Sequence, residues 1–209
     1  TGQVQIAVIP TALSMVHELT TPFREKHPDV TFAVLSRTST EIQALLDNLQ
    51  IDVGITYLDN EPLGRVTSIP LYYERYHLVT SNFDDIGDRE SITWREAAEF
   101  PLCLLTPDMQ NRRIINQHLT EAGARVNPTL ESDSMIALFT HVHTGNWASI
   151  MPVKMVKEFS MRDRVKSIPI VDPDASHLVG MIAAKREPAT PVVSALLKEA
   201  KNISELAPA

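Results

Sequence analysis

Cysteine, clustered basic charge and long apolar runs are scarce in this chain. Cys103 is the only cysteine among 209 residues, so no disulfide can form within the chain. The 19 Lys and Arg residues are outnumbered by 26 Asp and Glu, without a basic block. Because gripping a phosphate backbone needs a clustered basic face, we expect no DNA binding by this segment itself. No apolar run approaches the roughly 18–20 residues that cross a bilayer, so we expect no membrane partner.

The first third of the chain alternates between strand and helix periodicity. Apolar residues in the predicted helices recur at positions i, i+3, i+4 and i+7, and the predicted strands are short apolar runs. A strand, helix, strand, helix, strand order with short connections favours a parallel sheet with helices on its faces. The predicted elements are strand 4–9, helix 13–23, strand 30–35, helix 42–49 and strand 52–55. Thr38 and Glu41 stand at capping-box spacing ahead of the apolar stripe 42–49, which predicts where this helix begins.

A second set of elements follows in the same order. It consists of strand 102–105, helix 114–122, strand 129–131, helix 135–142 and strand 148–151. This order predicts two Rossmann-like α/β lobes in tandem.

Two further apolar stretches, 71–80 and 177–184, fit neither set and are predicted to be strands that cross between the lobes. Thr190 and Pro191 have the residue types of an N-cap and a first helical position, so a final helix would return to the first lobe. We therefore assign residues 1–79 with 186–209 to lobe I and residues 80–185 to lobe II.

Hydroxyl side chains gather where predicted helices begin. Helix amino ends attract anions, because their first N–H groups have no partner within the helix. Taken singly, each hydroxyl is more often an N-cap than a ligand contact. Four such junctions in two facing lobes, which would form a cleft lined by strand carboxyl ends, favour a ligand. The junction residues are Thr11 and Ser14, then Thr38, Ser39 and Thr40, then Thr106, and finally Ser132 and Ser134.

Other reactive side chains give no catalytic or metal pattern. His141 and His143 are two residues apart, which puts them on different faces of a helix and disfavours joint metal binding. Cys103 lies in an apolar strand and is most simply a core residue. No Gly-x-Ser-x-Gly motif is present, so we expect neither an enzyme, a metal nor a cofactor.

Three larger side chains leave alternatives open. Arg112 and Arg113 fit either a solvated helix face or an anion clamp. Trp147 follows a helix directly and fits either the wall of a cleft or core packing.

Two phrases together are fairly specific. Phe-x-x-x-His-Pro-x-Val at 23–30 is followed about twenty residues later by Leu-x-x-Asp-Val-Gly-Ile at 49–55. With these phrases, and with the stretches 71–79, 131–134 and 145–152, nearly the whole chain resembles the effector-binding domain of LysR-type transcriptional regulators.

The resemblance implies a type-2 periplasmic-binding-protein fold and a coinducer held between the lobes. It also implies an amino-terminal winged helix-turn-helix, absent from this chain, that binds promoter DNA. One departure is the stretch 143–147, where most members carry a Gly-x-Gly turn and this chain has a tryptophan. The family's pocket maps onto Thr11, Ala12, Thr38, Ser39, Thr40, Thr106, Met109, Ser132, Ser134, Gly145 and Trp147.

The function expected from these observations is the sensing of a small molecule, an anionic metabolite, by a cytoplasmic transcription factor. The alternative is a solute-binding protein of a transport system, which shares the fold but usually needs more residues per lobe. Val30, Phe32 and Val34 alternate on a possible edge strand, and such edges attract partners. We expect a homodimer of this fragment and a homotetramer of the full-length protein.

Overall fold

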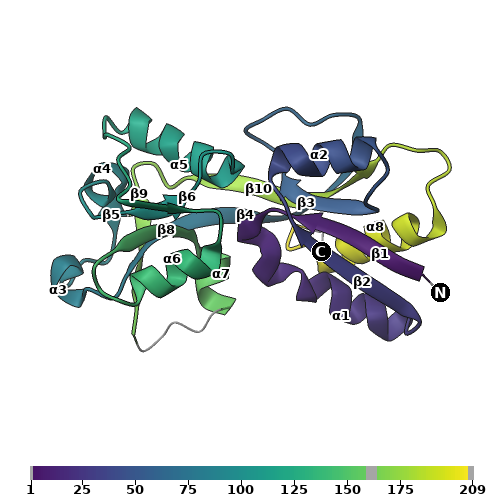
Figure 1. The fold of residues 1–209 in the computed structure, drawn as a ribbon, viewed down its shortest axis with the longest axis horizontal. Coiled ribbons are helices and arrows are strands. Elements are labelled where there is room, and N and C mark those ends of the chain that lie inside the picture. Colours follow the sequence, from purple (N-terminus) through teal and green to yellow (C-terminus); the bar gives the residue numbers. More distant parts are fainter. Residues whose placement is uncertain (1, 159–163, 207–209) are drawn as a thin grey trace. The chain divides into compact units, whose positions relative to one another are not determined.

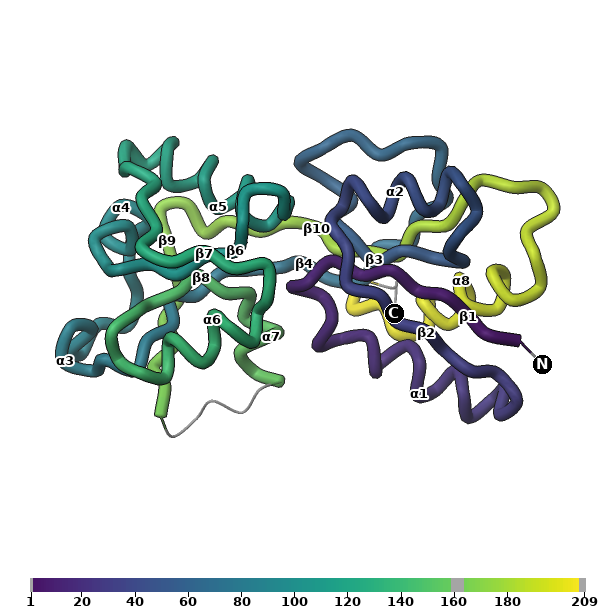
Figure 2. Tube along the Cα trace, in the orientation of Figure 1, coloured from purple at the N-terminus to yellow at the C-terminus, as the bar shows by residue number. Residues whose placement is uncertain are grey.

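The computed structural model describes residues 2–158 and 164–206 (Figure 1). Its chain divides into two compact units, unit 1 with residues Thr1–Tyr73 and His177–Ala209, and unit 2 with Glu74–Ser176. Strands β4 (Val66–Thr80) and β10 (Ser176–Ala184) carry the chain from one unit to the other, and Figure 2 lets both be followed. The boundaries predicted from the sequence, 79/80 and 185/186, lie near the ends of these strands, whereas the chain changes unit inside both strands.

Unit 1 contains the first strand-helix set. Strand β1 pairs in parallel with β2 and β3, and β10 runs antiparallel to β3, which gives the order β2-β1-β3-β10 with β2 at the edge. The sheet packs closely on α2, since a Cβ built on Gly54 would lie 2.4 Å from Ile42 Cγ2. The elements are β1 (Gly2–Val8), η1 (Pro10–Met15), α1 (His17–Lys26), β2 (Val30–Ser36), α2 (Ser39–Asp47), β3 (Val53–Tyr57) and α8 (Pro191–Ile203).

Two helix starts in unit 1 follow local sequence signals. Thr38 is the N-cap of α2, and its hydroxyl accepts the Glu41 N–H at 3.1 Å. Thr190 caps α8 in the same way, with Pro191 in the first turn. The first helix differs from expectation, because residues 10–15 form a separate 3₁₀ helix and α1 begins only at His17.

Unit 2 contains the second set, and its strands β6 and β7 are parallel as expected. The end of β4 pairs antiparallel with both β8 and β9, and β9 pairs with β5. An apolar core around Cys103, Leu138 and Met151 joins the strands to α6 and α7. The elements are α3 (Phe83–Ile86), β5 (Ile92–Thr93), α4 (Trp94–Ala97), β6 (Cys103–Leu105), α5 (Gln110–Glu121), β7 (Leu130–Ser132), α6 (Met135–Val142), β8 (Ala148–Pro152), α7 (Val153–Glu158) and β9 (Lys166–Val171).

The structure confirms the expected α/β fold class, with a strand-helix set in each of two units. Over residues 2–158 and 164–206, no helix is both long and apolar enough to span a bilayer.

Candidate functional site

The carboxyl ends of β1 and β3 bring Thr11 and Tyr57 together in unit 1. Thr11 is 2% exposed, and its Oγ1 lies 3.4 Å from the Tyr57 hydroxyl in a buried hydrogen bond. Ala12, the next residue, is fully buried. Tyr57 meets His177 edge to face, with ring centroids 6.5 Å apart, and His177 Nδ1 lies 3.1 Å from Asp59 Oδ1. The sequence reasoning missed Tyr57, His177 and Asp59.

The amino end of α2 is the other candidate in unit 1. The Thr38 hydroxyl is already occupied, because it accepts the Glu41 N–H as the N-cap. The next two residues, Ser39 and Thr40, lie in the first turn of the helix. An α-helix supplies no acceptor for first-turn N–H groups, and its dipole favours an anion there. Ser39 is buried and Thr40 is exposed, so this turn extends from the interior to the surface.

In unit 2, the predicted ligand-binding residues Thr106, Ser132 and Ser134 form hydrogen bonds with one another. Thr106 N–H donates to the Ser132 carbonyl at 3.1 Å, and the N-cap of α5 is Met109, a core residue, instead of Thr106. Ser134 is the N-cap of α6 but makes no side-chain cap, and its N–H donates to Ser132 Oγ at 3.1 Å. The structure therefore places Thr106 beside Ser132 without a hydroxyl cap on α5 or α6.

Gly145 and Trp147 follow the end of α6. Gly145 has φ = +81°, a conformation that favours glycine, and its N–H donates to the Val142 carbonyl. The Trp147 indole N–H donates to Thr129 Oγ1 at 3.0 Å, and its ring meets His141 edge to face at 5.0 Å. Trp147 also packs against the core of unit 2, which supports the core-packing interpretation.

Arg112 is neither a solvated residue nor a free clamp. It is 4% exposed, and its NH1 lies 2.7 Å from the Leu105 carbonyl and 2.5 Å from Glu131 Oε2. Nε donates to Asn116 Oδ1 at 2.8 Å. The guanidinium thus ties α5 to β6 and β7. Arg113 donates to the carbonyls of residues 107 and 108 beside the start of α5.

Cys103 and His77, which both lie in unit 2, have shifted pKa values. Burial raises the pKa of the Cys103 thiol to about 11. Burial, and then the positive charge of Lys157, lowers the pKa of His77, whose Nδ1 lies 2.6 Å from Ser167 Oγ. Cys103 is fully buried in unit 2, whereas His77 is partly buried.

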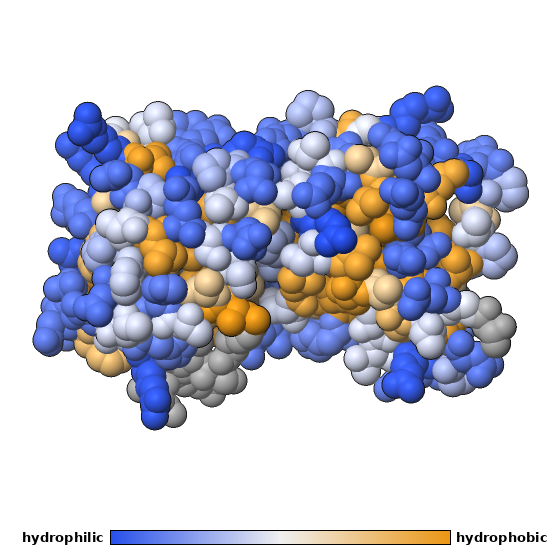
Figure 3. Space-filling model, in the orientation of Figure 1, coloured by the Kyte–Doolittle hydropathy of each residue, from blue (hydrophilic) through white to orange (hydrophobic). Residues whose placement is uncertain are grey.

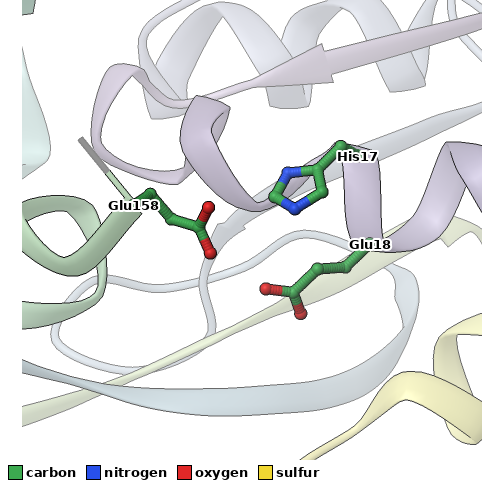
Figure 4. A group of neighbouring side chains, drawn as sticks. All are labelled: His17, Glu18 and Glu158. Atoms are coloured by element: carbon green, nitrogen blue, oxygen red, sulfur yellow. The ribbon is translucent and has the colours of Figure 1, made fainter. Parts of the chain in front are cut away.

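The two histidines considered for metal binding make local bonds. His141 Nδ1 lies 2.5 Å from the Ala137 carbonyl, and His143 Nδ1 lies 2.6 Å from that of Phe139. Figure 4 labels a different group, His17 and Glu18 from α1 and Glu158 from α7. These side chains belong to different units, so we assign no metal site to them.

The sequence matches the family model of the LysR substrate binding domain over residues 1–203, so the chain belongs to this family. Among curated proteins it is 27% identical over 123 residues to the HTH-type transcriptional regulator SsuR of Burkholderia cenocepacia, covering 59% of this chain and 40% of that protein. The chain spans 40% to 56% of the length of the curated relatives it matches.

Solved structures share the fold. The effector binding domain of QuiR, in complex with shikimate, has a TM-score of 0.78 at 21% identity, with 95% of each chain covered. The regulatory domain of Synechocystis CcmR, in complex with 2-PG, has a TM-score of 0.84 at 15% identity, with 100% of each chain covered.

Proposed function

We propose that this chain is the effector-sensing domain of a LysR-type transcriptional regulator, and that an anionic metabolite is its effector. The family match over residues 1–203 carries this proposal. The relatives it matches are transcriptional regulators, which favours a sensor over an enzyme or a transport protein. QuiR and CcmR were solved with small molecules bound, which supports a ligand of this size.

The ligand contacts proposed for unit 1 are Thr11, Ala12 and the first turn of α2. The α2 turn is the strongest of them, because it offers N–H groups and the Ser39 hydroxyl beside an already capped helix start. Contacts from Thr106, Met109, Ser132, Ser134, Gly145 and Trp147 stay predictions.

A metabolite screen by thermal shift tests the proposal, because a ligand that binds only the folded chain raises its Tm. The full-length protein should then change its affinity for promoter DNA, or its transcription, when the same compound is added. DNA binding would reside in a winged helix-turn-helix outside residues 1–209, and a protein with this role would act in the cytoplasm. A specific complex of residues 1–209 alone with promoter DNA would contradict the assignment of DNA binding to another part of the protein.

We also propose a homodimer of this domain and a homotetramer of the full-length protein. Strand β2 lies at the sheet edge with Val34 42% exposed, and apolar side chains gather over β1 and β2 in Figure 3. An open groove of about 520 Å³ runs beside this edge and is lined by Thr20, Thr21, Arg24, Glu25, Pro28 and Phe32.

Light scattering tests the dimer. The unmutated domain should give about twice its chain mass of 23.3 kDa. Val34→Asp should give monomers that still bind the effector, since a charge on an apolar contact opposes association. A monomer at high concentration without mutation would contradict the dimer.

A further inference from the structure

Leu49, in unit 1, has a backbone conformation that does not suit a leucine. It follows the carboxyl end of α2 with φ = +57°, and the N–H of the next residue, Gln50, donates to the Leu45 carbonyl at 2.8 Å. Glycine, or sometimes asparagine, usually occupies such a position, because other side chains are strained there. Leu49 is also 53% exposed. Stability alone therefore favours glycine or asparagine, and a backbone outlier of this kind points to an interaction.

Leu49 lines a small pocket whose residues all belong to unit 1. The pocket has a volume of about 90 Å³. A cavity of about 150 Å³ holds a benzene molecule, so this pocket has room for one aliphatic side chain. Its lining combines the apolar residues Leu49, Ile51, Ala184 and Val193 with polar residues that include Asp52 and Arg186.

The pocket lies at the end of the sheet where β1 begins. Strands β1 and β3 are parallel and begin at the same end of the sheet, and the antiparallel β10 ends there. Asp52, just before β3, bonds to Gln5 of β1 twice: its N–H donates to the Gln5 carbonyl at 2.9 Å, and its Oδ2 accepts the Gln5 N–H at 2.7 Å. The amino ends of β1 and α8 both lie on the right in Figure 1. Neighbouring strands are about 4.8 Å apart, so a few residues ahead of Gly2 are enough to reach from β1 to the pocket.

We infer that this pocket binds an aliphatic side chain of the connecting segment, defined as the residues that precede Thr1 in the full-length protein. This inference rests on the proposed function, which assigns DNA binding to an amino-terminal part outside residues 1–209. The curated relatives have the length for such a segment, because this chain spans only 40% to 56% of them. Docking would cover the exposed Leu49 side chain, and this contact would offset the strain of its backbone.

The polar residues of the pocket indicate what should lie beside the docked side chain. Asp52 Oδ2 already accepts the Gln5 N–H, and Thr190 Oγ1 accepts the Val193 N–H at 3.3 Å. Arg186 is exposed and makes no ion pair with the residues that the structure describes. Its guanidinium favours a carboxylate as a neighbour. The occupant should therefore be an aliphatic residue next to an aspartate or glutamate.

Amide hydrogen exchange of the full-length protein, compared with that of residues 1–209 alone, tests the docking. The amides of residues 49–52 and 186–193 should exchange at least about fivefold more slowly in the full-length protein, because docking opposes local opening of this end of unit 1. The amides of α5, in unit 2, serve as the internal reference and should exchange at the same rate in both proteins.

Two variants of the full-length protein assign the slower exchange to the pocket. Leu49→Asn should raise the exchange rates to those of residues 1–209 alone, because asparagine tolerates a positive φ but lacks the apolar contact. Gln50→Asn is the matched control, since Gln50 is the next residue, is exposed and does not line the pocket. It should leave the slow exchange unchanged. In the connecting segment, replacing the aliphatic residue beside an acidic one with serine should act as Leu49→Asn does. Circular dichroism should show that all three variants are folded.

Equal exchange of residues 49–52 and 186–193 in the two proteins overturns the inference, and so does an equal effect of Leu49→Asn and Gln50→Asn. Protection that grows with the concentration of residues 1–209 alone also overturns it, because the occupant is then a second copy of the chain. The proposed function fails separately, if no metabolite in the thermal-shift screen stabilises the chain. Effector-dependent DNA binding without a difference in exchange would leave the sensing function intact and remove only the docking.

Discussion

The two units share an order of elements but use their polar side chains differently. In unit 2, the Arg112 guanidinium and the Trp147 indole bond to groups of the same unit. In unit 1, the Thr38 hydroxyl caps α2, and the N–H groups of Ser39 and Thr40 in the first turn have no acceptor within the helix. The shared order of strands and helices therefore does not mean that both units carry the same kind of binding site. We expect unit 1 to recognise the anionic group of the effector, and the polar groups of unit 2 to contribute first to its stability.

The largest effect is expected for the rate at which the Cys103 thiol is modified. This rate tests whether the core of unit 2 excludes solvent and reagents. A rise in pKa from 9.0 to about 11 leaves about a hundredfold less thiolate at pH 8, and the thiolate is the reactive form. The native chain should therefore react with a thiol reagent at least that much more slowly than the urea-unfolded chain. Comparable rates in both states would show that the thiol is open, and would contradict an inert core cysteine.

Arg112→Ala should destabilise unit 2 by about 2–3 kcal/mol, because it removes the bonds to Leu105 and Asn116 and the ion pair with Glu131. Urea unfolding monitored by Trp fluorescence measures this change. Arg113→Ala is the control and should change stability by under about 1 kcal/mol, since Arg113 is less buried than Arg112 and donates to the carbonyls of residues 107 and 108. Equal losses of unfolding free energy in both variants would contradict the inference that Arg112 links α5 to β6 and β7.

His77 should give the smallest effect, seen as a pH dependence. Its pKa is lower in the folded chain than the usual 6.5, so below that pH the unfolded chain binds more protons. Stability should therefore fall as the pH decreases below 6.5, and His77→Gln should flatten this fall. His17→Gln, at an exposed position, serves as the control. A pH profile that His77→Gln leaves unchanged would assign the dependence to other groups.

Local signals predicted much of the fold, because caps and periodicity are encoded by neighbouring residues. Thr38 and Glu41 located the start of α2, and Thr190 and Pro191 located that of α8. The 3₁₀ helix at Thr11 was missed, since its residues fit the apolar periodicity of a longer α-helix.

Long-range contacts could not be predicted in this way. The partners of Arg112 include Glu131, nineteen residues away, and Tyr57 meets Thr11 from another strand. These positions depend on sheet register, which local patterns do not specify.

The central claim is that unit 1 holds an anionic effector, and calorimetry of the compound found by thermal shift tests it most directly. Ser39→Ala and Thr11→Val should each lose about 1.5–3 kcal/mol of binding free energy, a tenfold or greater loss of affinity, because each removes a hydrogen bond to a charged group. Their circular dichroism spectra should match that of the unmutated chain. Unchanged affinity in both variants would contradict the account and move the site away from these residues.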